Sequence, residues 1–270
     1  MKGHIRERSP GRFAIVIDVN DPQTGQRKRK WHSFAGTKRD AQVECARLIT
    51  EMDSGAYVEH DRQSLNQFLN TWERDWMTTK VSPKTAERYA ELLRKHVRPA
   101  LGDKRMQAIR AEDLNRLYAH LHEKLAPRTV KHVHRLLHRI FGHAFKWRAV
   151  KDNVIARVDS PKVPATEAAV LQTTEIPRLF AALRGRGDAF YPIAIVALGA
   201  GLRRGELLAL RWQDVDLDGG SLRVERSLEE TSAGLRFKAP KSERSRRTIS
   251  LAPAVCPNCA LIGEHSRSSG

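Results

Sequence analysis

The sequence predicts a multidomain, mainly α-helical protein with a small β-sheet-plus-helix module at its N-terminus and a partial α+β domain towards its C-terminus. Three observations predict this class. Residues 13–34 contain two strand-like runs, residues 62–149 repeat apolar side chains at helical spacing, and residues after 190 combine an apolar helix with strand patterns. A length of 270 residues allows two or three compact domains.

The chain is strongly basic, with a formal net charge of +17, yet 40% of its residues are hydrophobic. That apolar content is enough to build cores, so the charge does not indicate a disordered tail. A basic globular protein most often has a polyanionic partner, which favours nucleic acid over an anionic membrane surface or ribosomal RNA. No apolar run has the length of a signal peptide or membrane span, which favours a cytoplasmic protein with no membrane partner. Three cysteines, Cys45, Cys256 and Cys259, do not make a disulfide framework.

The first element we expect is a module of sheet and helix over residues 1–58. A turn signal at 9–11 precedes a β-rich run at 13–17, and a second strand follows at 27–34. Thr37 can cap a helix that continues to about Asp53. Successive cations on the second strand project to both of its faces, which indicates DNA contact; the alternative is a solvated edge strand. These cations are Arg27, Lys28, Arg29 and Lys30.

Residues 62–155 are expected to form a four-helix domain. Apolar residues at helical spacing begin at Leu65, and later helices open at Pro83, Ala111 and Pro127. Four amphipathic helices in so short a segment predict a compact bundle. We expect its outer faces to contact DNA through Lys84, Arg88, Lys131 and Arg135.

Histidines in this bundle raise the question of a metal site. His134 and His138 stand at i and i+4, a spacing that can ligate a metal on one helix face. No glutamate of an H-E-x-x-H pattern lies between them and no third ligand is evident. We therefore expect both imidazoles to contact phosphate or solvent.

The next element is a proline-extended linker at 153–166, followed by two helices. Thr174 is expected to cap the first, which has Pro177 at an early position. The second is an apolar helix over 190–198.

That apolar helix leads into Leu-Gly-Ala-Gly-Leu-Arg-Arg-Gly-Glu at 198–206, followed by Leu-Arg-Trp-Gln-Asp. This stretch resembles the first catalytic box of the tyrosine recombinases, the family that includes phage integrases. Gly201 allows a tight turn, and a guanidinium just before a helix can grip a phosphate bidentately. The resemblance implies that Arg203 clamps the scissile phosphate, Arg204 faces solvent or DNA, and Glu206 holds the turn.

A second stretch, Phe-Lys-Ala-Pro-Lys-Ser-Glu-Arg-Ser-Arg-Arg-Thr-Ile-Ser-Leu at 237–251, resembles the β-hairpin of the same family. A lysine at that turn donates a proton to the leaving 5′-hydroxyl in the family, and Lys241 is the matching residue. Arg244 and Arg246 are expected to contact DNA. The alternative is a solvated basic turn.

The resemblance extends upstream in the family's order. It implies an arm-type DNA-binding module at 1–58, a core-binding helical domain at 62–155 and the N-terminal half of the catalytic domain at 166–251. Residues 252–270 form an atypical tail.

Two further stretches have spacings found in metal sites. Asp214, Asp216, Asp218 and Glu225 match the spacing of an EF-hand calcium loop, but the residues after Gly219 alternate like a strand, which favours a helix–turn–strand junction. The tail pattern Cys-Pro-Asn-Cys at 256–259 is half of a zinc knuckle and lacks a second pair. We expect no metal and no cofactor.

The family also needs a His-x-x-Arg pair, a further His or Trp and a nucleophilic Tyr, all downstream of the hairpin. Here every tyrosine precedes Arg203: Tyr57, Tyr89, Tyr118 and Tyr191. We therefore expect a site-specific recombinase or integrase that is cut short after Leu251, binds double-stranded attachment or core sites at the nucleoid, could form a homo-oligomer on DNA, and is catalytically incomplete. Its partial catalytic domain is expected to be unstable alone. The alternative is a non-catalytic DNA-binding regulator or competitive inhibitor of recombination.

Overall fold

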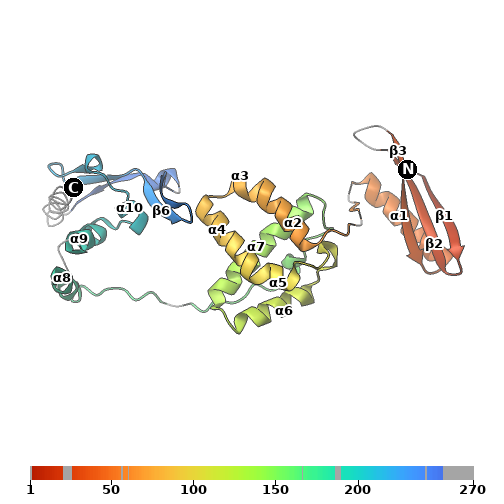
Figure 1. Cartoon of the computed structure of the whole chain (residues 1–270), viewed down its shortest axis with the longest axis horizontal. Coiled ribbons are helices and arrows are strands. Elements are labelled where there is room, and N and C mark those ends of the chain that lie inside the picture. The colour runs from red at the N-terminus through yellow and green to blue at the C-terminus, as the bar shows by residue number, and fades with distance from the viewer. Residues whose placement is uncertain are drawn as a thin grey trace. The chain divides into compact units, whose positions relative to one another are not determined.

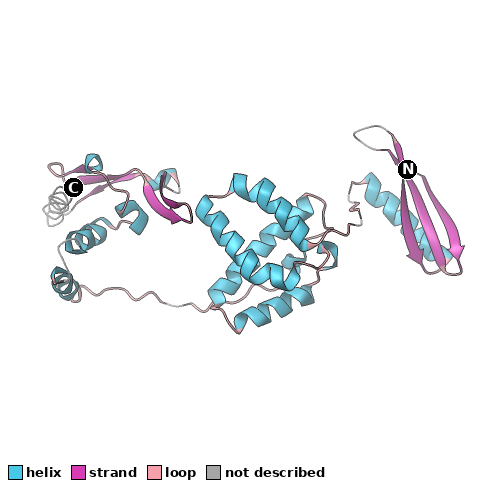
Figure 2. Cartoon of the chain, in the orientation of Figure 1, coloured by secondary structure: helices cyan, strands magenta, loops and turns pink. Residues whose placement is uncertain are grey.

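The computed structural model divides the chain into two compact units, one of residues 1–77 with 92–163 and one of residues 78–91 with 164–270. Helices predominate in the described part of the chain and the strands form small sheets, as the sequence predicts (Figure 2). The structure describes residues 2–20, 26–55, 57–59, 61–165, 167–185, 190–240 and 242–251.

An antiparallel sheet covered by one helix forms the N-terminal module (Figure 1). Ile15 and Ile17 of the central strand are fully buried against Cys45 and Leu48 of the helix. Thr37 caps that helix as predicted, because its hydroxyl accepts from the backbone N–H of Asp40. The elements are β1 (Lys2–Ser9), β2 (Arg12–Asn20), β3 (Arg27–Ala35) and α1 (Lys38–Asp53).

Strand β1 was not predicted. Its sequence, Lys-Gly-His-Ile-Arg-Glu-Arg-Ser, has a single aliphatic residue, Ile5, which packs against the module's core. A strand with so little apolar alternation cannot be recognised by its pattern, and pairing with β2 is what orders it.

All four predicted helices of the middle segment are present and begin where the sequence places them. The structure adds π-helical turns at Glu73–Met77 and Leu93–Val97. The second of these precedes Pro99, which has no N–H to donate and whose ring crowds the carbonyl four residues back, so a wider turn relieves the conflict. The helices are α2 (Leu65–Trp72), α3 (Thr78–Lys80), α4 (Pro83–Leu92), α5 (Arg98–Leu101), α6 (Ala111–His122) and α7 (Pro127–Lys146).

The helical core of the first unit is made by side chains that the spacing places inward. Trp147, the C-cap residue that follows α7, is 43% exposed. The predicted linker after α7 contains a 3-10 turn, Val154–Arg157, whose first two side chains are buried. Fully buried core residues include Leu69, Trp72, Leu93, Leu114, Leu137 and Ile140.

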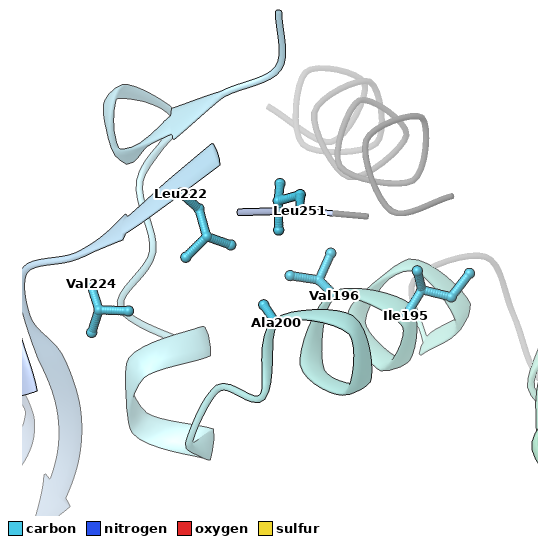
Figure 3. Packing of buried hydrophobic residues seen from close by; sticks show 6 residues of the cluster. All are labelled: Ile195, Val196, Ala200, Leu222, Val224 and Leu251. Carbon is cyan, nitrogen blue, oxygen red and sulfur yellow. The ribbon is translucent and has the colours of Figure 1, made fainter. Parts of the chain in front are cut away.

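The second unit contains short helices and two small sheets. Apolar residues of α9 pack against β5 and Leu251 to form its core (Figure 3). Thr174 does not cap α8, which begins after Glu175 without a side-chain cap. The elements are α8 (Ile176–Arg184), α9 (Phe190–Ala200), α10 (Arg204–Leu207), β4 (Val215–Asp216), β5 (Ser221–Val224), β6 (Ser227–Thr231), β7 (Gly234–Lys238) and β8 (Arg247–Ser250).

The strand pairing corrects the predicted hairpin at 237–251. Strand β7 pairs with β6, whereas β8 pairs with β5 in the sheet β4-β5-β8. Strands β7 and β8, which residues 239–246 connect in sequence, therefore lie in different sheets and do not pair as a hairpin. The polar, basic sequence of this connection is equally compatible with both arrangements, and only the pairing of distant strands decides between them.

Candidate functional site

The site is built around Arg203, which stands at the junction of α9 and α10. Gly201 adopts a φ of +59°, the left-handed conformation that glycine tolerates best, and so allows the tight turn that the sequence predicts. Arg203 follows in an extended conformation as the N-cap of α10. Its side chain is 73% exposed, which leaves the guanidinium accessible to a ligand.

A buried carboxylate holds this turn together. Glu206 is only 5% exposed; its Oε2 accepts from the backbone N–H of Arg203 at 3.1 Å and its Oε1 from Nη1 of Arg203 at 2.8 Å. Burial acts to raise the pKa of Glu206, but hydrogen bonds from Arg247 and Arg203 outweigh it and bring the pKa to about 2. The predicted role of Glu206 in holding the turn is confirmed.

Arg247 is a site residue that the sequence reasoning missed. Its Nη2 donates to Oε2 of Glu206 at 2.9 Å, and its side chain is 31% exposed. Two guanidiniums thus converge on one carboxylate. Alternation along β8 is the signal that could have found it, because Arg246 is exposed whereas Arg247 is half-buried.

Asp214, the first residue of the pattern with EF-hand spacing, is paired with an arginine. The carboxylate accepts two hydrogen bonds from the Arg211 guanidinium, at 2.9 and 2.8 Å, and one from the Arg211 backbone N–H. The hydrogen bonds from Arg211 hold the pKa of Asp214 below its usual range. Ser221–Val224 is a strand as expected, and Asp216 accepts from the backbone N–H of Gly219. Val215–Asp216 is itself a short strand that pairs with Ser221 and Leu222, so the turn joins two strands where a helix–turn–strand junction was expected.

The other basic residues near this box are only partly described. Lys241, the predicted proton donor, lies outside the described residues, as do Cys256 and Cys259. Arg244 and Arg246 are exposed, and neither has an ion-pair partner within the part of the chain that the structure describes.

In the N-terminal module the predicted cations are largely paired. Arg27 and Arg29 both donate to Asp18, at 2.5 and 3.3 Å. Lys30 lies 3.1 Å from Glu59 and over the ring of Tyr57. Lys28 is exposed. The strand therefore presents less free positive charge than its sequence suggests.

On the helices, Lys84 and Arg88 of α4 are exposed and pair with Glu87 and Glu91 one turn later. Exposed ion pairs of this kind stabilise a protein by only about 0.2–1 kcal/mol, so a phosphate can compete with the glutamates for both cations.

On α7, Lys131 and Arg135 line a groove along the helix together with Arg139, Gly142, His143 and Lys146. We call this surface the α7 groove. Lys131, Arg135 and Lys146 have no ion-pair partner among the described residues.

His134 is more buried than predicted. Its side chain is 7% exposed and its Nδ1 lies 3.2 Å from the hydroxyl of Tyr118, so it packs largely in the core, and its remaining exposed edge lines the α7 groove. Desolvation lowers the pKa of His134, and the charge of His138 adds to that effect. His138 is exposed as expected.

Two features, a cluster of metal-binding side chains and a membrane-spanning helix, are absent from the described ranges. Those ranges contain no cluster of three or more His, Cys, Asp or Glu side chains placed to hold a metal ion. None of the helices described is both long enough and apolar enough to cross a membrane.

Part of this chain matches a known family model, and the sequence has relatives among known proteins. Residues 64–122 match the family model "Phage integrase, N-terminal SAM-like domain". A "Tyrosine recombinase XerC-like" protein of Caldanaerobacter subterraneus is 23% identical over 94% of this chain and 68% of its own length. An "Integrase" of Saccharopolyspora erythraea is 28% identical over 81% of this chain, which spans only 49% of that protein.

Solved structures agree in fold. The Tn1549 transposon integrase in complex with transposon right end DNA superimposes with a TM-score of 0.62 at 20% identity, covering 75% of this chain and 65% of that one. A lambda integrase dimer bound to a COC′ core site gives a TM-score of 0.54 at 17% identity, covering 87% and 65%. The fold is therefore the multidomain, α-rich fold of integrases.

Sequence relatives and fold point to one family. The chain is similar to the tyrosine recombinase, or phage integrase, family in residues 64–122, in its sequence relatives and in its fold.

Proposed function

We propose that this chain binds duplex DNA at attachment or core sites as part of a site-specific recombinase that integrates and recombines phage or mobile-element DNA. The observation that carries the proposal is the exposed guanidinium of Arg203, held at the start of α10 by the buried carboxylate of Glu206. A fixed guanidinium beside a helix N-terminus suits a phosphate, which it can bind with two parallel hydrogen bonds.

The remaining roles follow the resemblance. Arg203 clamps the scissile phosphate, and Lys241 protonates the leaving 5′-hydroxyl. Residues 1–58 are the arm-type module, 62–155 the core-binding domain and 166–251 the N-terminal half of the catalytic domain. The family-model match over 64–122 supports the second of these assignments.

DNA contact would come from the basic surfaces. Support comes from Lys131, Arg135 and Lys146 on α7 and from Arg244 and Arg246, which have no ion-pair partner among the described residues. We further propose that copies assemble on DNA at the nucleoid, since lambda integrase is known as a dimer on a core site and a tetramer on a Holliday junction.

We also propose that residues 1–270 bind such sites without cleaving them. Within these residues no tyrosine follows Tyr191, which itself precedes Arg203. The same observation favours the second candidate function, a DNA-binding regulator or competitive inhibitor of recombination.

Binding is tested by fluorescence anisotropy with a short mixed-sequence DNA duplex over a range of salt concentrations. The logarithm of the association constant should fall linearly with the logarithm of salt, by about 0.9 for each phosphate neutralised. Affinity that does not respond to salt contradicts the proposal.

Cleavage is tested on duplexes enriched by binding from a random pool. Each is supplied with a nick that traps a covalent intermediate, and products are separated on a denaturing gel. We expect no protein–DNA adduct. A covalent adduct would show that a nucleophile is present after all.

A further inference from the structure

The α7 groove has the character of a surface for a polyanion. Its cations, Lys131, Arg135, Arg139 and Lys146, recur along one face of the helix, and no carboxylate lines it within the described residues. The charges alone do not show at which residue of α7 a bound polyanion comes closest to the helix backbone. Gly142, in the middle of the groove, supplies that information.

Gly142 lies inside α7, a continuous helix of 20 residues. Glycine in a helix interior is destabilising relative to alanine, so its presence there needs a reason. A Cβ added at Gly142 would meet only Nδ2 of Asn153, at 3.7 Å, which is ordinary van der Waals contact. The described structure would therefore accept alanine, and the missing side chain is not explained by packing within the protein.

The next residue, His143, offers a hydrogen-bond donor at the same point. Its Nδ1 accepts from Nε1 of the buried Trp72 at 2.7 Å, so the neutral ring carries its proton on Nε2. Burial lowers the pKa of His143, with the charges of Lys146 and Arg139 adding to that effect, which keeps the ring in this neutral form. Because His143 lines the groove, Nε2–H is a donor for a ligand there.

We propose that Gly142 is a close-approach position for the DNA backbone: a phosphate lies directly against the bare helix there, accepts from Nε2–H of His143 and is flanked by Lys146 and Arg135. The inference rests on the proposed DNA binding and assigns one phosphate contact to a particular place on α7. A side chain at position 142 would hold the backbone away from the donor.

The test is Gly142→Ala in the full chain, measured by anisotropy with the mixed-sequence duplex and by thermal unfolding. We expect unchanged or higher thermal stability together with about tenfold weaker binding, the effect of one lost charge-assisted hydrogen bond. Gly142→Met, with a longer side chain at the same position, should weaken binding further. Lys146→Gln should reduce the salt dependence by about one phosphate.

Gly185→Ala is the matched control, because a Cβ there also meets only ordinary contact, 3.7 Å from a backbone oxygen, at a site outside the groove. It should bind DNA like the wild type. If the wild type itself does not bind, the proposed function fails. If the wild type binds and Gly142→Ala binds equally well, or loses affinity only because it unfolds, the close-approach position is wrong while the proposed function stands.

Discussion

The guanidinium of Arg247 donates to the carboxylate of Glu206 across 41 residues of sequence, at 2.9 Å. This contact joins strand β8 to the turn that presents Arg203. Arg203 lies beside Glu206 in sequence, so it would meet the carboxylate in any fold that forms this turn. Arg247 reaches it only when β8 pairs with β5, and the arginine site is therefore complete only when the sheet has formed.

We predict that Glu206→Gln destabilises the second unit by about 1–2 kcal/mol, because the neutral amide loses charge-assisted hydrogen bonds that the buried carboxylate accepts, while both arginines stay partly in solvent. Hydrogen exchange of α10 and β8 measures the loss directly. Glu230→Gln, an exposed glutamate on β6, is the matched control and should exchange like the wild type. Equal protection in both variants would show that the carboxylate does not organise the site.

Acid should weaken the same unit through the same residue. The pKa of Glu206 is about 2 in the folded state against an ordinary value of 4.5, so its contribution is fully present above about pH 4.5 and is lost as the pH falls towards 2. Hydrogen exchange of α10 over this range should show protection falling in the wild type. In Glu206→Gln that part of the pH dependence should vanish, and an unchanged acid profile would contradict the assignment.

Much of this fold could be predicted from sequence because its signals are local. Helical spacing and proline starts place α4 and α7 correctly, and Thr37 with Asp40 marks the start of α1. Strand β1 could not be predicted in this way because it is polar and is ordered by its neighbour. The hairpin at 237–251 was misplaced because register between distant strands is not encoded in either strand alone.

The residues of the site also separate into those whose contacts are local in sequence, which could be predicted, and those whose contacts are distant, which could not. Arg203, Gly201 and Glu206 are neighbours in sequence, and the motif correctly predicts the turn at Gly201 and the carboxylate that holds it. Arg247 was missed because its partner is distant. His134 was misjudged because it lies at the edge of the buried face of α7, next to Val133 and Leu137, and spacing alone cannot say how wide the buried face is.

Mild acid should destabilise the first unit through His134 and His143. Both pKa values lie below the ordinary 6.5, chiefly because of desolvation, so folding favours the neutral rings. Their contribution is present above about pH 6.5 and is lost as the pH falls through the folded values. Urea unfolding followed by tryptophan fluorescence at a series of pH values should show the decline. His134→Gln should flatten it, whereas His132→Gln, an exposed control, should not; similar slopes in all three proteins would rule out the buried ring as the cause.

Arg203 should contribute one phosphate contact to DNA binding without being needed for the turn. Its side chain is 73% exposed. When the guanidinium is removed, Glu206 still accepts hydrogen bonds from the backbone N–H of residue 203 and from Arg247. Arg203→Gln should therefore leave exchange at α10 nearly unchanged and lower the salt dependence of duplex binding by about one phosphate. Arg178→Gln removes the same charge from an exposed position of α8 and separates a specific contact from a change in net charge. If both variants reduce the salt dependence equally, Arg203 acts through its charge alone and the clamp is not engaged.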